Sequence, residues 1–137
     1  MAERVLELRV PARAGELKHV RIAVRSCAEA AGMGETGVQD VVMAVDEACQ
    51  NVIRHAYGEE GAGDMLLEVD RDDDTLVFCL KDFAPPVDPT QVKPRDLEEV
   101  RPGGLGTHLI NEVMDSAGFV ADPPGCGNLL RMVKQIR

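Results

Sequence analysis

Two long helical patterns stand next to each other early in this chain, and strand patterns surround them in directly connected pairs. Apolar residues recur at helical spacing over residues 15–32 and 36–57, and glycine closes each stretch. A third helix is predicted over residues 107–117. Alternating apolar and polar residues predict strands over residues 3–10, 64–70, 75–81, 119–121 and 128–136.

The order of these elements favours an α+β fold. Most strands follow one another along the chain without an intervening helix, which is typical of antiparallel pairing. We therefore expect a two-layer sandwich, in which a mixed, mostly antiparallel sheet carries the helices on one face. The chain has 137 residues, the length of one average domain, so residues 1–137 are predicted to form a single domain.

Charge and hydropathy make several classes of function less favourable for this chain. The net charge of −9 disfavours direct nucleic-acid binding, because phosphate contacts need a basic surface. It suits a basic protein partner, although solubility alone also explains it. The sequence has no apolar run of 18 residues and no signal-peptide pattern, so we expect no membrane span and a cytoplasmic location. The four cysteines form no CxxC pair, and we expect no disulfides.

A carboxylate and an amide lie one turn apart on the second predicted helix. Glu47 and Asn51 are four residues apart and share the polar face, opposite Val45 and Val52. A carboxylate can accept a hydroxyl proton, and an amide oxygen is a neutral ligand that suits Mg²⁺. The pair could activate a serine hydroxyl beside a metal-bound phosphate. A solvated helix face is the alternative interpretation.

An aspartate stands at the end of the strand predicted over residues 75–81. Asp82 precedes the irregular stretch at residues 83–86. Its carboxylate could therefore point into a pocket and accept a hydrogen bond from an exocyclic amine such as that of adenine. An aspartate that starts a turn is the simpler alternative.

Glycines open the third predicted helix. In residues 101–107, RPGGLGT, backbone N–H groups could approach a phosphate closely, and the helix dipole favours the anion. Arg101 could add positive charge near a terminal phosphate, and Thr107 could donate from its hydroxyl. No Gly-Lys-Ser/Thr follows and the strand-glycine-helix order is missing, which excludes a Walker A loop and a Rossmann turn. A tight loop that caps the helix is the alternative.

The order of these three motifs resembles that of the GHKL (Bergerat-fold) ATPases. Within that superfamily the chain is similar to the small anti-sigma-factor serine/threonine-protein kinases, from the first predicted strand to the last. The likeness is most specific at residues 46–57, DEACQNVIRHAY, and at residues 104–115, GLGTHLINEVMD. It implies the Bergerat, or HATPase, fold.

The resemblance implies a role for each matching residue. Glu47 would be the general base, Asn51 the Mg²⁺ ligand and Asp82 the partner of the adenine amine. His55 would lie close to the nucleotide without an assigned chemical role, and Arg101 would act at the terminal phosphate. Residues 87–103 would form the ATP lid. The phosphates would be held by Gly103, Gly104, Leu105, Gly106 and Thr107.

The resemblance also implies a function. A serine-protein kinase of this kind would bind ATP or ADP with Mg²⁺ and transfer the γ-phosphate to a serine of an anti-anti-sigma (STAS-domain) partner. As an anti-sigma factor it would also sequester a sigma factor. It would then regulate transcription by exchanging the two partners with its nucleotide state. Relatives of this size suggest a homodimer.

The sequence departs from the family pattern just after Asp82 and at the start of the last predicted strand. Ala84 and Pro86 occupy the two glycine positions that usually follow the aspartate, and Asn128 stands where relatives often have threonine. Ala84 and Pro86 favour a second hypothesis, a non-catalytic module that binds nucleotide or none and acts only by protein contact. A phosphotransfer domain of a histidine kinase is a third hypothesis. It is disfavoured because no helix with a phosphoacceptor histidine precedes the first strand.

Overall fold

The computed structural model describes residues 2–57, 63–85 and 108–137. Its helices and strands are β1 (Ala2–Pro11), α1 (Leu17–Ala30), α2 (Glu35–Asn51), β2 (Asp64–Asp72), β3 (Thr75–Asp82), β4 (Ser116–Phe119) and β5 (Asn128–Gln135). A 3₁₀ turn, Ala14–Glu16, precedes α1, a π-helical turn, Val52–Ala56, continues α2, and a short helix covers residues 108–113. Among these described residues, no helix has the length and apolar character that a membrane span needs.

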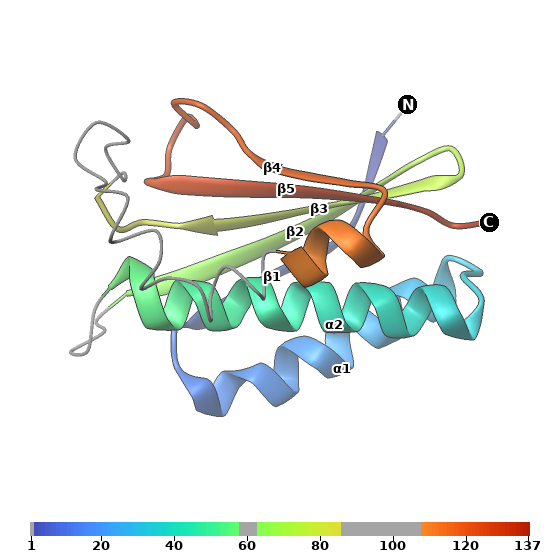
Figure 1. Ribbon diagram of the computed structural model, residues 1–137, viewed down its shortest axis with the longest axis horizontal. Helices are drawn as coiled ribbons and strands as arrows, with labels where there is room; N and C mark the ends of the chain where they lie inside the picture. The colour runs from blue at the N-terminus through green and yellow to red at the C-terminus, as the bar shows by residue number, and fades with distance from the viewer. Residues whose placement is uncertain (1, 58–62, 86–107) are drawn as a thin grey trace.

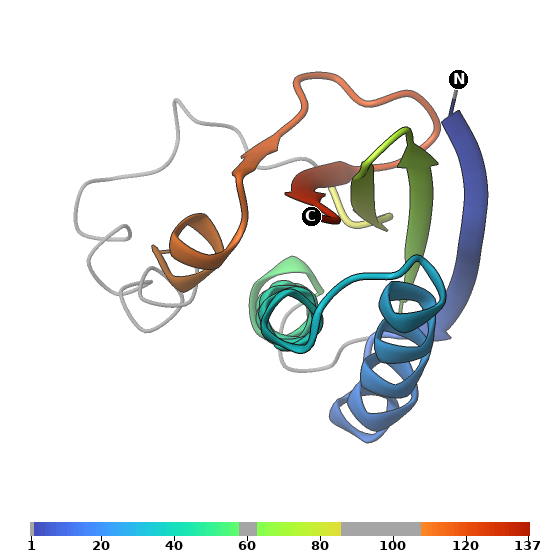
Figure 2. The same ribbon diagram turned by 90° about the vertical axis from the view of Figure 1, so that its right-hand side faces the viewer.

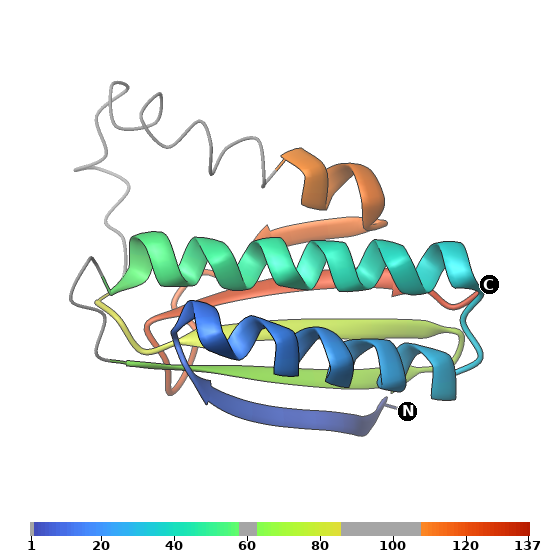
Figure 3. The same ribbon diagram turned by 90° about the horizontal axis from the view of Figure 1, so that it is seen from below.

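The five strands form one sheet in the order β1-β2-β3-β5-β4, and each pairing is antiparallel. Figure 1 shows α1 and α2 below the sheet, and Figure 3 shows both helices lying across one of its faces. Figure 2, turned to look along the helices, shows them on one side of the curved sheet. The expected α+β sandwich is therefore confirmed, and its sheet is antiparallel throughout the described pairings rather than mixed.

Apolar side chains from both layers meet between the sheet and the helices. In the central strands every second residue is buried: Met65, Leu67 and Val69 in β2, and Leu76, Phe78 and Leu80 in β3. The helices bury one stripe each: Val20, Val24 and Ala28 in α1, and Val38, Val41, Ala44, Val45, Ala48 and Cys49 in α2. Because this stripe fixes how α2 rotates against the sheet, it also fixes which α2 residues face outward.

All four cysteines are free, as expected from their spacing. Cys49 lies within the buried stripe of α2, and burial raises the pKa of its thiol to about 12. The thiol therefore stays protonated and packs as a small apolar group.

The sheet face opposite the helices carries a cluster of charges. Arg4 lies 2.6 Å from Glu68 and 2.5 Å from Asp70, and Lys81 lies 2.5 Å from Glu68. The hydrogen bond from Lys81, reinforced by Arg4, lowers the pKa of Glu68. A bulge at Val5 interrupts the pairing of β1 with β2. Charges and a bulge on an edge strand discourage its pairing with another chain.

The third helix and the strand after it differ from the prediction. The sequence pattern predicts a helix over residues 107–117 and a strand over 119–121, whereas the helix described covers residues 108–113 and β4 begins three residues earlier. The Asp115 N–H donates to the Val133 carbonyl at 2.9 Å, and β4 then pairs along β5. These long-range hydrogen bonds end the helix, and the local apolar spacing does not reveal them.

Candidate active site

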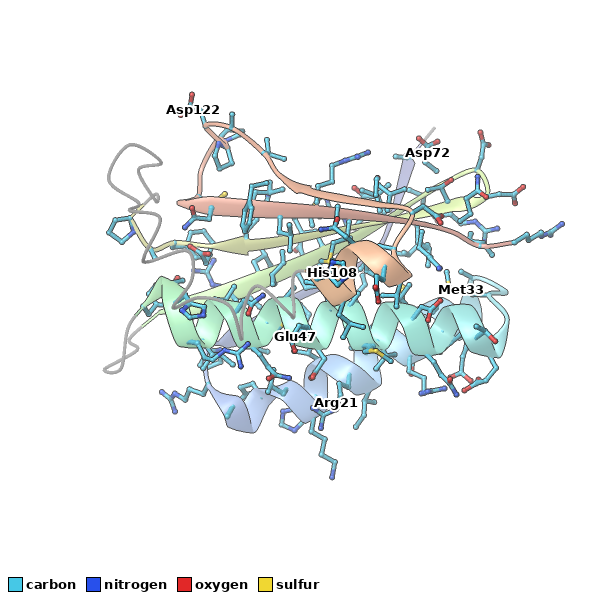
Figure 4. All side chains as sticks on the ribbon, viewed as in Figure 1. Arg21, Met33, Glu47, Asp72, His108 and Asp122 are labelled. Carbon is cyan, nitrogen blue, oxygen red and sulfur yellow. The ribbon has the colours of Figure 1, made fainter. Side chains whose placement is uncertain are left out.

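Glu47 and Asn51 lie on the part of α2 that the core does not cover. Val45, Ala48 and Cys49 are buried on the opposite side, whereas Glu47 and Asn51 are both partly exposed. The Glu47 side chain keeps 18% of its surface accessible. Figure 4 labels it midway along α2. The predicted pair therefore shares one helix face that a ligand can reach.

A single guanidinium nitrogen joins these two side chains. Nη2 of Arg54 donates to Oδ1 of Asn51 at 2.9 Å and to Oε1 of Glu47 at 3.1 Å. Arg54 belongs to the π-helical turn, and such turns are frequent at functional sites. It is not among the predicted site residues, although positions 47, 51 and 54 follow the i, i+4, i+7 spacing of one helix face. The carboxylate and amide oxygens thus converge on one cationic group.

The acidic residue before Glu47 has its own partners. Asp46 accepts a hydrogen bond from Arg21 of α1 at 2.9 Å and another from Gln50 at 2.7 Å. Figure 4 labels Arg21 on α1, the helix beside α2. The Arg21–Asp46 pair links the two helices and does not involve Glu47 or Asn51.

Asp82 is the one buried charged residue among those described, with 5% of its surface exposed. It ends β3 directly opposite Asn128, the first residue of β5. Its Oδ1 accepts from the Asn128 side-chain amide at 2.9 Å and from the Ala84 N–H at 3.1 Å. Both of these bonds fall on Oδ1. The Asn128 side chain therefore orients the carboxylate.

The backbone at Ala84 does not need glycine. Among the described residues only Asp73 and Asp122 have positive φ without being glycine, so Ala84 is unstrained. The close approach here falls on Gly127, just before β5, because a Cβ at Gly127 would lie 1.7 Å from the Ala84 carbonyl oxygen. The Gly127 N–H also donates to the Asp82 carbonyl at 2.8 Å. The departure from the family pattern at Ala84 is thus compatible with a well-formed turn beside Asp82.

Tyr57 connects the end of the α2 helix with the ends of β2 and β3. Its hydroxyl donates to the Asp64 carbonyl at 2.7 Å and accepts from the Phe83 N–H at 2.7 Å. Burial is the main cause that raises the pKa of Tyr57, so the hydroxyl keeps its proton. The end of the α2 segment, at Tyr57, and the residue that follows Asp82 are therefore in contact at one end of the molecule. The start of β1 and the end of β5 lie at the other end (Figure 1).

The remaining predicted residues are less constrained. His55 is exposed in the π-helical turn, and partial desolvation, with a smaller effect of Arg54, lowers its pKa. His108 is exposed beside Glu112, 3.0 Å away. The following lie outside the described residues: Pro86, Arg101, Gly103, Gly104, Leu105, Gly106 and Thr107. Their roles stay predictions.

The two-layer fold and a comparison with known families together assign this chain to a class of ATPase domains. The family model of the histidine kinase-like ATPase domain matches residues 10–134, so this chain belongs to that family. Membership implies a domain that binds ATP.

Curated relatives narrow the family further. The chain is 27% identical over 140 residues to the serine-protein kinase RsbW of Bacillus cereus strain B4264 and to that of Bacillus anthracis strain A0248. RsbW of Bacillus thuringiensis strain Al Hakam is similar to the same extent. These alignments cover 96% of this chain and 85% of each relative. The chain is thus related to the RsbW anti-sigma-factor kinases over nearly its whole length.

A solved structure shows the same fold. It is the crystal structure of the RsbU and RsbW domains of Rv1364c from Mycobacterium tuberculosis, with a TM-score of 0.67 and 14% sequence identity. The match covers 96% of this chain and 31% of that longer chain. At this identity the likeness concerns the fold alone.

Proposed function

We propose that this chain is an ATP-dependent serine-protein kinase and anti-sigma factor. It would phosphorylate a serine of a STAS-domain anti-anti-sigma partner, sequester a sigma factor and act as a homodimer. The observation that carries the kinase proposal is the convergence of Glu47 and Asn51 on one nitrogen of Arg54. The relatives named as serine-protein kinases support the reaction type. The partners and the dimer rest on the family resemblance.

The residues around Asn51 fit a magnesium ion. The Asn51 amide oxygen is a hard ligand, and the Arg54 guanidinium already places a positive charge against it. Asn51 would hold the metal together with the nucleotide phosphates, since Mg²⁺ usually takes only one or two protein ligands. When bound, the ion would supply neutralisation of phosphate charge.

Glu47, Asp82 and Arg101 would have three further roles, in proton transfer, adenine binding and phosphate binding. Glu47 would accept the proton of the attacking serine hydroxyl, because its carboxylate lies one turn from the metal ligand and stays accessible. Asp82 would bind the adenine amine through Oδ2, while Asn128 and the Ala84 N–H hold its other oxygen. Arg101 and the glycines at residues 103–106 would bind the phosphates, as their sequence pattern predicts.

Phosphate transfer from labelled ATP to a purified STAS-domain partner tests the proposal. Glu47→Gln keeps the shape of the side chain and removes its basicity, so we expect the transfer rate to fall by about 10²–10⁴-fold with ATP binding retained. Glu35→Gln is the matched control, because Glu35 is an exposed acid at the start of the same helix. A wild-type transfer rate in Glu47→Gln would contradict the assigned base.

The Glu47–Arg54 ion pair also favours a second candidate, the non-catalytic module. The Arg54 guanidinium lies 3.1 Å from the Glu47 carboxylate and occupies an oxygen that a serine hydroxyl would need. If Glu47 stays engaged when nucleotide binds, the chain would act through protein contacts alone. Calorimetric titration with ATP and Mg²⁺, followed by the transfer assay, distinguishes binding without transfer from binding with transfer.

A further inference from the structure

Arg54 places a positive charge where the proposed metal ligand and the proposed base meet. Its Nη2 lies 2.9 Å from the Asn51 oxygen and 3.1 Å from a Glu47 oxygen. A magnesium ion bound by the same Asn51 oxygen would lie about 2.0–2.1 Å from it, in the space that such a nitrogen occupies or borders. A guanidinium and a divalent cation also repel each other at this separation. Two cations on this one oxygen would therefore disfavour each other.

We propose that Arg54 competes with Mg²⁺ for Asn51, so that metal-dependent nucleotide binding requires its guanidinium to leave Asn51 and Glu47. The inference rests on the proposed function, because it assumes that Asn51 is the metal ligand. Arg54 is then a positioning residue. In the nucleotide-free protein it holds Glu47 and Asn51 together, and its departure frees the carboxylate to act as a base.

The two hydrogen bonds from Arg54 to Asn51 and Glu47, called the clasp below, suit a reversible contact rather than a permanent structural link. Its side chain is 42% exposed, so the guanidinium can move into water without crossing the core. Both of its hydrogen-bond acceptors, Glu47 and Asn51, lie on the preceding turns of the same helical segment. Ion pairs of this exposure contribute little to folding, so the clasp can open without unfolding α2.

Arg21 provides a matched control on the neighbouring helix. It pairs with Asp46, the residue next to Glu47, at 2.9 Å. The exposed fractions of the two side chains are 44% and 19%, against 42% and 18% for Arg54 and Glu47. Arg21→Met therefore removes the same charge with the same exposure, but touches neither Asn51 nor Glu47.

The test is a titration of Mg²⁺ into the full chain with a non-hydrolysable ATP analogue at fixed concentration, with analogue binding as the readout. In Arg54→Met the Mg²⁺ concentration for half-maximal binding is expected to fall by about three- to tenfold, because Mg²⁺ no longer has to displace a guanidinium from Asn51. Arg54→Lys should lie between Arg54→Met and the wild type, since an ammonium lacks the planar fork. Arg21→Met should match the wild type.

A second readout follows the clasp itself. The ¹⁵N signals of the Arg54 side chain should shift when Mg²⁺ and the analogue are added together, and the circular dichroism of each variant checks that it is folded. Equal midpoints in Arg54→Met and Arg21→Met would overturn the clasp and leave the kinase proposal standing. A higher midpoint or lost binding in folded Arg54→Met would also overturn it, because Arg54 would then help to hold the ligand. Absence of Mg²⁺-dependent binding in the wild-type chain would overturn both proposals.

Discussion

The hydrogen bond between Asn128 and Asp82 offers a direct measure of how the buried carboxylate is held. Asn128→Ala removes one of two donors to Oδ1 of a side chain that is only 5% exposed. A hydrogen bond to a charged group contributes about 1.5–3 kcal/mol to stability. Because Asn128 is half-buried and water can partly replace its amide, we expect the free energy of unfolding to fall by about 2 kcal/mol.

Urea unfolding of the wild type and three variants checks this value. Asn128→Thr, which restores a hydroxyl donor, should lose less than Asn128→Ala. Gln39→Ala is the control, since Gln39 is an exposed amide on α2 whose hydrogen bond to Glu35 is 3.3 Å long. It should change the free energy of unfolding by no more than about 0.5 kcal/mol. The reasoning is refuted if Asn128→Ala is as stable as Gln39→Ala.

Three further predictions follow from packing and charge. Gly127→Ala should destabilise the fold by about 2 kcal/mol or more in urea, because its Cβ would meet the Ala84 carbonyl oxygen, whereas Gly118→Ala, with open space around it, should not. The pKa of Glu68 is lower in the folded protein than its ordinary value of 4.5. Ionised Glu68 therefore stabilises the fold at pH values above 4.5, and this stabilisation is lost as the pH falls through the lowered pKa. The free energy of unfolding of Glu68→Gln should therefore lie below that of the wild type at neutral pH and converge with it in acid. Cys49 should resist a thiol reagent at pH 8 in the native protein and react after unfolding, as mass spectrometry can show.

The layers of the fold could be predicted from local periodicity, because each element shows its buried face in its own sequence. The stripe of α2, with Val45 and Ala48 inward, appears in the sequence and in the structure alike. β4 could not be placed in this way. Its backbone hydrogen bonds go to β5, beyond an irregular segment, and nothing in residues 114–117 alone distinguishes them from a helix end.

In the candidate site, too, local spacing predicts some features, and others depend on long-range contacts. Asn51 and Glu47 were predictable because helical spacing alone puts them together. The clasp of Arg54 was not, since the spacing indicates a shared face but not which of several acceptors a long side chain selects. The partnership of Asp82 with Asn128 depends on strand register across 46 residues, which no local pattern fixes.

The two hydrogen bonds of Tyr57 limit which side chains position 57 can tolerate. Its single hydroxyl satisfies one carbonyl and one amide at once, and the aromatic ring sets the reach. No other standard amino acid combines that length with a group that both donates and accepts. A saturation library selected for folding should therefore retain tyrosine here. Phe83, which contributes its backbone to this bond, should accept many replacements.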